Sequence, residues 1–140
     1  MPRFVDASVF VHAYLRPRRE LKPHERRIKA QARAIVTRVN EGEAIVISTV
    51  HVGEVANVLE EWMGLETAQA VQRGLCARHT VEILPVARGD LLEALSAASE
   101  AGVGTTDALA AILMRDRGLR EIYSFDRDFD RFEDLCRVTE

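Results

Sequence analysis

The sequence predicts an α/β fold, a three-layer α/β/α sandwich around a mostly parallel sheet. Short β-branched runs alternate with longer stretches of helical spacing along the whole chain, and no internal repeat, low-complexity tract or long linker interrupts them. With 140 residues, 47% hydrophobic and 29% charged, the composition is that of one ordinary globular domain. We therefore expect a single domain over residues 1–140.

Five segments have the length and the β-branched content of strands. The first follows directly from the start of the chain, without the charged region, long apolar core and cleavage site of a secretion signal. No apolar run approaches the ~20 residues needed to cross a bilayer. We therefore expect a cytoplasmic protein with no membrane partner. The strands are predicted at residues 3–7, 44–48, 81–85, 121–125 and 136–139.

Six segments have helical periodicity, and glycines end several of them. The helices are predicted at residues 8–15, 25–42, 51–63, 66–79, 90–102 and 105–118. Two of them carry apolar residues at i, i+3, i+4 and i+7 spacing, which predicts a buried stripe. These stripes are Val55, Val58, Leu59 and Trp62 in the third helix, and Leu91, Leu95 and Ala98 in the fifth.

The cysteines and histidines show no zinc-binding pattern. Cys76 and Cys136 are too few and too far apart for a metal knuckle. Two buried thiols are the simplest interpretation, and a disulfide is the alternative for a hyperthermophilic source. The four histidines lack ligand spacing such as H-x-x-x-H, and they are His12, His24, His51 and His79.

Positive charge is concentrated between Arg16 and Arg38. Nine Lys or Arg residues in this segment face only Glu20 and Glu25, so its charge is +7. Because the whole chain carries −3, the remainder carries −10. Such a patch would attract phosphates, and the alternative is a solvated amphipathic helix with an arginine-rich outer face.

Acidic residues recur where strand ends run into helix N-termini, the position at which open parallel sheets bind ligands. Asp6 stands in the apolar run FVDA at the end of the first predicted strand. As a helix cap it would contribute about 0.5–2 kcal/mol, but Ser8 could cap equally well. A carboxylate inside an apolar run is costly for capping alone, so we favour a functional role.

Two further acids lie on predicted helices. Asp107 is in the first turn of a helix that Thr105 or Thr106 can cap, and a favourable helix-dipole interaction is the alternative explanation. Glu54 lies at the edge of the apolar arc of its helix. A carboxylate at a core boundary needs a cation or hydrogen-bond donors, and an arginine partner is the alternative here.

The segment SFDRDFDRF crowds Asp126, Asp128 and Asp130 after the fourth predicted strand. An Asp-rich turn is the alternative explanation. The D-x-D-x-D pattern also opens an EF-hand loop, but the required glycine and terminal glutamate are absent, which excludes that calcium site.

These acids are expected to converge. Asp6, Asp107 and Asp126 fall where three strand–helix junctions should meet, with Glu54 projecting from the helix after another strand. Like charges this close would destabilise the fold without a divalent cation, and their hard oxygen ligands suit Mg²⁺ or Mn²⁺.

Four segments resemble, in order, the sequence blocks of PIN-domain ribonucleases. They are FVDASVFVHAYL, ISTVHVGEVANVL, TTDALAAILM and YSFDRDFDRF. The resemblance implies a metal-dependent nuclease acting on single-stranded or structured RNA, similar to VapC-type toxins of toxin–antitoxin pairs. By matching position, it implies a catalytic, metal-binding centre of Asp6, Glu54, Asp107 and Asp126, with Ser8, Ser124 and Asp128 in supporting roles.

In this interpretation three of the acids hold the metal, and Glu54 binds the metal or orients the attacking water. The basic segment would hold the RNA backbone, so binding should weaken as salt rises. An antitoxin partner and a homodimer through the helix at 66–79 are also expected. The candidate RNA contacts are Arg16, Arg18, Arg19, Arg26 and Arg27.

Two other classes of protein remain as alternatives. A phosphoacceptor or phosphatase domain would also collect acids at strand ends. However, the chain has no lysine in its last two predicted strands, and Ala7-Ser8 follow Asp6 where Asp-x-Asp is required. The second alternative is a non-catalytic PIN-like module that binds RNA or protein.

Overall fold

The computed structural model describes all 140 residues and contains one five-stranded sheet, in which every strand runs parallel to its neighbours. The predicted α/β/α sandwich with a mostly parallel sheet is confirmed. The strands are β1 (Arg3–Val5), β2 (Ile45–Ser48), β3 (Val81–Leu84), β4 (Glu121–Tyr123) and β5 (Cys136–Val138). The helices are α1 (Ala7–Tyr14), α2 (Pro23–Asn40), α3 (Thr49–Met63), α4 (Leu65–Ala77), α5 (Arg88–Ala101), α6 (Thr105–Asp116) and the short 3₁₀ helix η1 (Arg127–Arg131).

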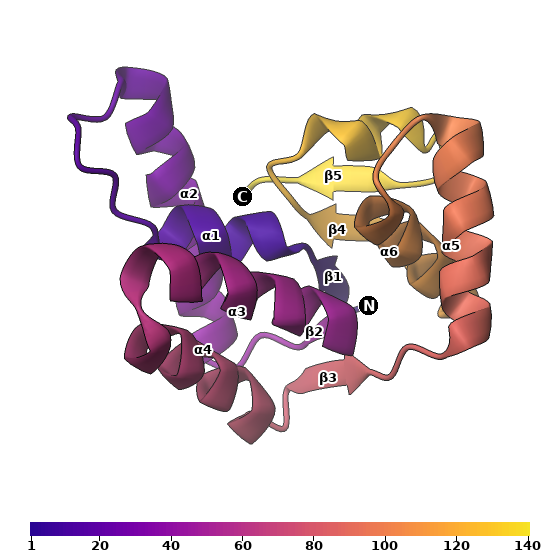
Figure 1. The fold of residues 1–140 in the computed structure, drawn as a ribbon, viewed down its shortest axis with the longest axis horizontal. Coiled ribbons are helices and arrows are strands. Elements are labelled where there is room, and N and C mark those ends of the chain that lie inside the picture. The colour runs from indigo at the N-terminus through magenta and orange to yellow at the C-terminus, as the bar shows by residue number, and fades with distance from the viewer.

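Two groups of helices enclose the sheet (Figure 1). Helices α1 to α4 cover one face, and α5, α6 and η1 cover the other. Because side chains alternate along a strand, Val5 of β1 packs against the first group and Phe4 against the second. All four residues of β2 are buried, as expected for a strand covered on both faces. None of the helices has both the length and the apolar content to cross a membrane.

The strand order places a ligand site at one end of the sheet. The order is β3-β2-β1-β4-β5, so the chain builds outward from β1 in one direction and then returns to β4 on its other side. In open parallel sheets, ligands bind at the carboxyl ends of the strands at such a reversal point. The Asp6 N–H donates to the carbonyl oxygen of Tyr123 at 3.0 Å, which holds the ends of β1 and β4 together there.

The predicted core stripe of α3 is wrong at its end, because the Trp62 side chain is 69% exposed. The fifteen residues of α3 extend about 22 Å. The four residues of β2 extend only about 13 Å, so the helix runs beyond the sheet that it covers. Leu59 is the last fully buried residue of α3.

The predicted stripe of α5 is confirmed at Ala98 and wrong at Leu91 and Leu95. Its buried residues are Ala94 and Ala98, which pack in the cluster that contains α6. Small residues allow the two helices to approach closely, and this turns Leu91 and Leu95 outward. Both cysteines are exposed free thiols, so the prediction of two buried thiols is wrong as well, because Cys76 lies on the outer side of α4 and Cys136 at the sheet edge.

The difference between these leucines and the true core can be measured. Leu109 of α6 is fully buried, and truncating it to alanine should lower the free energy of unfolding by about 2–5 kcal/mol because it leaves a cavity. Leu95→Ala, at a side chain 51% exposed, is the matched control and should change it far less. Urea denaturation of both variants tests this, and equal losses would contradict the described packing.

Candidate metal centre

Asp6 is a buried carboxylate at the end of β1, with only 4% of the residue exposed. It occupies the N-cap position of α1, but its side chain makes no capping hydrogen bond. Instead, the Ser124 hydroxyl donates to its Oδ2 at 2.9 Å. Capping therefore does not explain this acid, and its position at the reversal point of the sheet favours a functional role.

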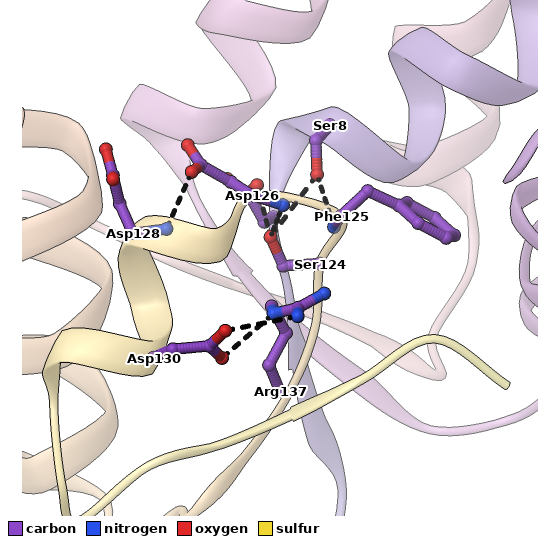
Figure 2. Close-up of polar contacts among 8 residues, drawn as sticks. Ser8, Ser124, Phe125, Asp126, Asp128, Asp130 and Arg137 are labelled. Atoms are coloured by element: carbon purple, nitrogen blue, oxygen red, sulfur yellow. Dashed lines mark hydrogen bonds and ion pairs between the residues drawn. The ribbon is translucent and has the colours of Figure 1, made fainter. Parts of the chain in front are cut away.

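Two serine hydroxyls hold the turn after β4 against the start of α1 (Figure 2). Ser8 Oγ accepts a hydrogen bond from the Phe125 N–H at 3.1 Å and lies 3.4 Å from Ser124 Oγ. Ser124 Oγ also accepts from the Asp126 N–H at 3.0 Å. These contacts place Asp126 beside Asp6, although the two acids are far apart in sequence.

The Asp-rich segment forms η1 rather than an irregular turn, and its acids point in different directions (Figure 2). Asp126 caps η1, since its Oδ1 accepts from the Asp128 N–H at 2.9 Å. Asp130 lies on the other side of η1 and pairs with Arg137 at 3.0 Å. Carboxylate oxygens of Asp107, Asp126 and Asp128 all lie within 4.8 Å of one another. Asp128 thus joins this group and Asp130 does not.

Asp107 reaches the group from the N-terminus of a helix that does not follow a strand. It lies in the first turn of α6, which follows α5 rather than a strand, so the expectation of three strand–helix junctions is wrong at this residue. The N-cap of α6 is Gly104, and neither Thr105 nor Thr106 occupies that position. The packing of α6 beneath the sheet brings its N-terminus, and with it Asp107, to the carboxyl ends of β1 and β4.

Glu54 is half-buried on α3 and has no arginine partner, because none of the ion pairs in the structure includes it. Burial raises the pKa of its carboxyl group, and the charges of Asp6 and Asp126 raise it further. A hydrogen bond with the Thr106 side chain acts in the opposite direction and lowers this pKa. The alternative of a simple arginine pair is therefore wrong.

The acids act on one another electrostatically. Burial, and then the charges of four further acids, together raise the pKa of Asp107 to about 7. These acids are Asp126, Asp6, Asp128 and Glu54. No lysine or arginine forms an ion pair with any of these five acids. An oxygen-only group of mutually repelling carboxylates fits a hard divalent cation such as Mg²⁺ or Mn²⁺.

A comparison with known families identifies the family of this chain. The family model described as the PIN domain matches residues 3–135. The chain belongs to the PIN domain family. Proteins of this family are generally nucleases. The resemblance seen in the four sequence blocks is thereby confirmed.

Solved structures share the fold of this PIN domain. The crystal structure of Mycobacterium tuberculosis VapC20, a toxin that cleaves the sarcin-ricin loop, is similar with a TM-score of 0.69 and 20% identity. The similarity covers 91% of this chain and 92% of VapC20. PAE2754 from Pyrobaculum aerophilum is similar with a TM-score of 0.65 and 18% identity, covering 99% and 90% of the two chains. Among curated proteins, no sequence matches this chain.

His51 is a buried residue of this PIN domain, and the sequence singled it out only as one of four histidines without metal-ligand spacing. Its ring lies edge-on to Phe4, with centroids 5.2 Å apart. Nε2 lies 3.0 Å from the carbonyl oxygen of Thr106, which can only accept, so the ring proton is on Nε2. Nδ1 then accepts from the Ser48 hydroxyl. Burial lowers the pKa of His51, in keeping with a neutral ring.

The position of His51 links the two helices that carry Glu54 and Asp107. Ser48 is the N-cap of α3, because its hydroxyl oxygen accepts a hydrogen bond from the His51 N–H at 3.2 Å. The spacing of three residues from an N-cap serine was the signal available in the sequence. The hydrogen bond from the His51 ring to the Thr106 carbonyl joins α3 to α6. It depends on tertiary structure because the two residues are far apart in the sequence.

Replacing His51 with leucine should weaken both the fold and metal binding. The Thr106 carbonyl would lose its donor, and an unsatisfied buried group costs about 1–3 kcal/mol of unfolding free energy. Loss of a group that orients ligands typically weakens metal affinity about 10–100-fold. Calorimetry with Mn²⁺ tests this, with partial recovery expected for His51→Gln, which keeps a donor. The exposed His79→Gln is the control, and a His51→Leu variant with normal affinity would contradict this role.

The five arginines predicted to contact RNA are all exposed. Arg16, Arg18 and Arg19 lie between α1 and α2, a segment that projects from the body of the molecule at the upper left of Figure 1. Arg26 and Arg27 follow on α2. Arg19 pairs with Glu25 at 2.6 Å, whereas the other four form no ion pair.

Proposed function

We propose that this PIN domain is an Mg²⁺- or Mn²⁺-dependent endoribonuclease that hydrolyses phosphodiester bonds in RNA. The observation that carries the proposal is the group of five acids from four segments, without an ion-pair partner, in which burial and mutual repulsion raise the pKa of Asp107 to about 7. Membership of a family of nucleases supports the reaction class. The fold shared with VapC20, a toxin that cleaves the sarcin-ricin loop, supports RNA as the substrate.

In the proposed site, Asp107, Asp126 and Asp128 would hold the metal through their carboxylate oxygens, together with the nearby Asp6. When bound, the metal neutralises charge on the phosphate and makes nearby water more acidic. The serine hydroxyls keep the acids oriented, since Ser124 donates to Asp6 and Ser8 holds the turn that carries Asp126.

Glu54 is suited to accept the proton of the attacking water. Burial raises the pKa of its carboxyl group, and it lies among the acids that would hold the metal. The water oxygen forms a bond to phosphorus, one P–O ester bond breaks, and the departing oxygen takes a proton from solvent. Glu54 then returns its proton to solvent, so the carboxylate is regenerated for the next reaction.

We further propose that the protein is a single-domain cytoplasmic toxin of a toxin–antitoxin pair, and that it forms a homodimer. The fold shared with VapC20 supports the toxin assignment. Helix α4 does not support the predicted dimer surface, because Ala68 and Leu75 are buried in the core of the same chain. The exposed leucines of α5 offer an apolar surface instead, and a monomer in sedimentation equilibrium would contradict the dimer.

The test of the nuclease proposal is cleavage of a labelled hairpin RNA by the full chain with Mg²⁺, with Mn²⁺ and with EDTA. Cleavage with either metal and none with EDTA is expected. Calorimetric titration with Mn²⁺ measures binding independently of activity. RNA binding without cleavage and without metal binding would instead favour a non-catalytic PIN-like module. The variant Glu61→Gln, on the exposed side of α3, is a control that should retain full activity.

A further inference from the structure

A groove of about 440 Å³ lies between the α1–α2 segment and the end of α3. Its volume is within the range of sites that bind small molecules or parts of larger ligands. Apolar side chains form much of its lining, and basic groups stand among them. The lining includes His12, Arg16, Ile28, Lys29 and Trp62.

Trp62 is an unusual residue for this position. It is the only tryptophan in the chain, and its side chain is 69% exposed beside the groove. It forms no aromatic pair and no cation–π contact within the chain. An indole face that is left open can receive a planar ring by stacking, and nucleobases stack on such side chains in single-stranded nucleic acid complexes.

The charge around the groove favours an anionic occupant. Arg16 and Lys29 line it, and the segment from Arg16 to Arg38 carries +7. Glu25, which also lines the groove, is paired with Arg19 and therefore does not oppose an anion. RNA offers both a planar apolar surface and regularly spaced phosphates, which matches an aromatic wall flanked by arginines.

The groove is connected to the acidic centre through two aromatic rings. His12, which lines the groove, lies edge-on to Phe125 with ring centroids 5.5 Å apart. Phe125 stands between Ser124 and Asp126 in the turn that belongs to the centre. Lys29 holds the end of α1 in place by donating to the carbonyl oxygen of His12 at 3.2 Å. The groove therefore adjoins the turn that carries Asp126.

We propose that this groove holds an unpaired nucleobase of the RNA substrate, stacked on Trp62, while Arg16 and the neighbouring arginines bind the flanking phosphates. This inference rests on the proposed nuclease function and adds a base-binding subsite to it. A base inside a duplex has both faces covered by its neighbours and cannot stack on a side chain. The substrate is accordingly RNA with an exposed loop, bulge or single strand.

Trp62 also makes the test direct, because all tryptophan fluorescence of this protein arises from this one side chain. The full chain is titrated in EDTA with a short single-stranded RNA and with a blunt duplex of equal charge. Saturable quenching by the single strand, and little by the duplex, is expected. Trp62→Leu should weaken single-strand binding, measured by anisotropy of a labelled RNA, roughly 5- to 150-fold.

Two further variants separate stacking from other effects. Trp62→Phe should retain much of the affinity because phenylalanine can also stack, whereas leucine of similar apolar character cannot. His79→Gln, at an exposed residue outside the groove, is the control and should bind normally. Normal RNA binding by Trp62→Leu, or quenching by an acidic peptide but not by RNA, would overturn the inference. Metal-dependent cleavage by the wild-type chain, assayed separately with Mn²⁺, would show that the nuclease function stands regardless.

Discussion

Replacing Asp6 with asparagine is expected to reduce RNA cleavage by more than about 100-fold without disrupting the fold. Loss of groups that merely orient metal ligands already costs about 10–100-fold, so loss of a ligand charge should cost more. The asparagine side chain has the same shape, and its carbonyl oxygen can still accept the hydrogen bond from Ser124. The fold is therefore expected to survive the change.

The measurement is the single-turnover cleavage rate of a hairpin RNA with Mn²⁺, together with circular dichroism of the variant. The matched control is Asp116→Asn at the other, exposed end of α6, which should cleave at the wild-type rate. Wild-type activity in Asp6→Asn would rule out Asp6 as a catalytic ligand. An unfolded variant would instead assign this carboxylate a structural role.

The metal-free protein is expected to lose stability as the pH rises from about 4 to above 7. The folded state raises the pKa of Asp107 to about 7 from the ordinary value of 3.8. Between these values the folded protein retains a proton that the unfolded chain has released, so stability falls as pH increases. The difference corresponds to at most about 4 kcal/mol, and solvent screening at this half-buried group reduces it.

The Asp107→Asn variant isolates this contribution from those of other titrating groups. It should be more stable than the wild type at pH 8 in EDTA and nearly equal to it at pH 4. Adding Mg²⁺ at pH 8 should stabilise the wild type and not the variant, since a ligand that binds only the folded state raises stability. Urea denaturation at both pH values measures these differences. If the variant and the wild type had the same pH dependence, the acids would not repel one another as described.

Much of the fold follows from local patterns in the sequence. The run of residues 44–48 predicts a strand, and β2, with all four of its residues buried, lies within that range. All five strands and six helices lie close to the predicted residue ranges. The reason is that short β-branched runs and 3.6-residue periodicity reflect the burial of individual elements, which each segment carries in its own residues.

The sequence predicted burial less well at helix surfaces. Trp62 and Leu95 continue apolar stripes in their helices, yet both are exposed. Periodicity shows which face of a helix is apolar, but the length of the neighbouring strand and the contact with the next helix determine how much is covered. In α5 the contact is made by alanines, and no local pattern distinguishes them from the leucines beside them.

By itself, the sequence determined the alternation of strands and helices, the family resemblance and the acidic residues that form the candidate centre. Only the tertiary structure decided how those acids meet. The reversal between β1 and β4 brings Asp6 beside the turn of Asp126, and the packing of α6 on α5 delivers Asp107. The tertiary structure also places Asp128 in the acidic group and Asp130 outside it. It leaves Trp62 exposed next to the basic segment. The physical reason is that these relations depend on contacts between residues distant in the chain, whereas local periodicity reports only on each element alone.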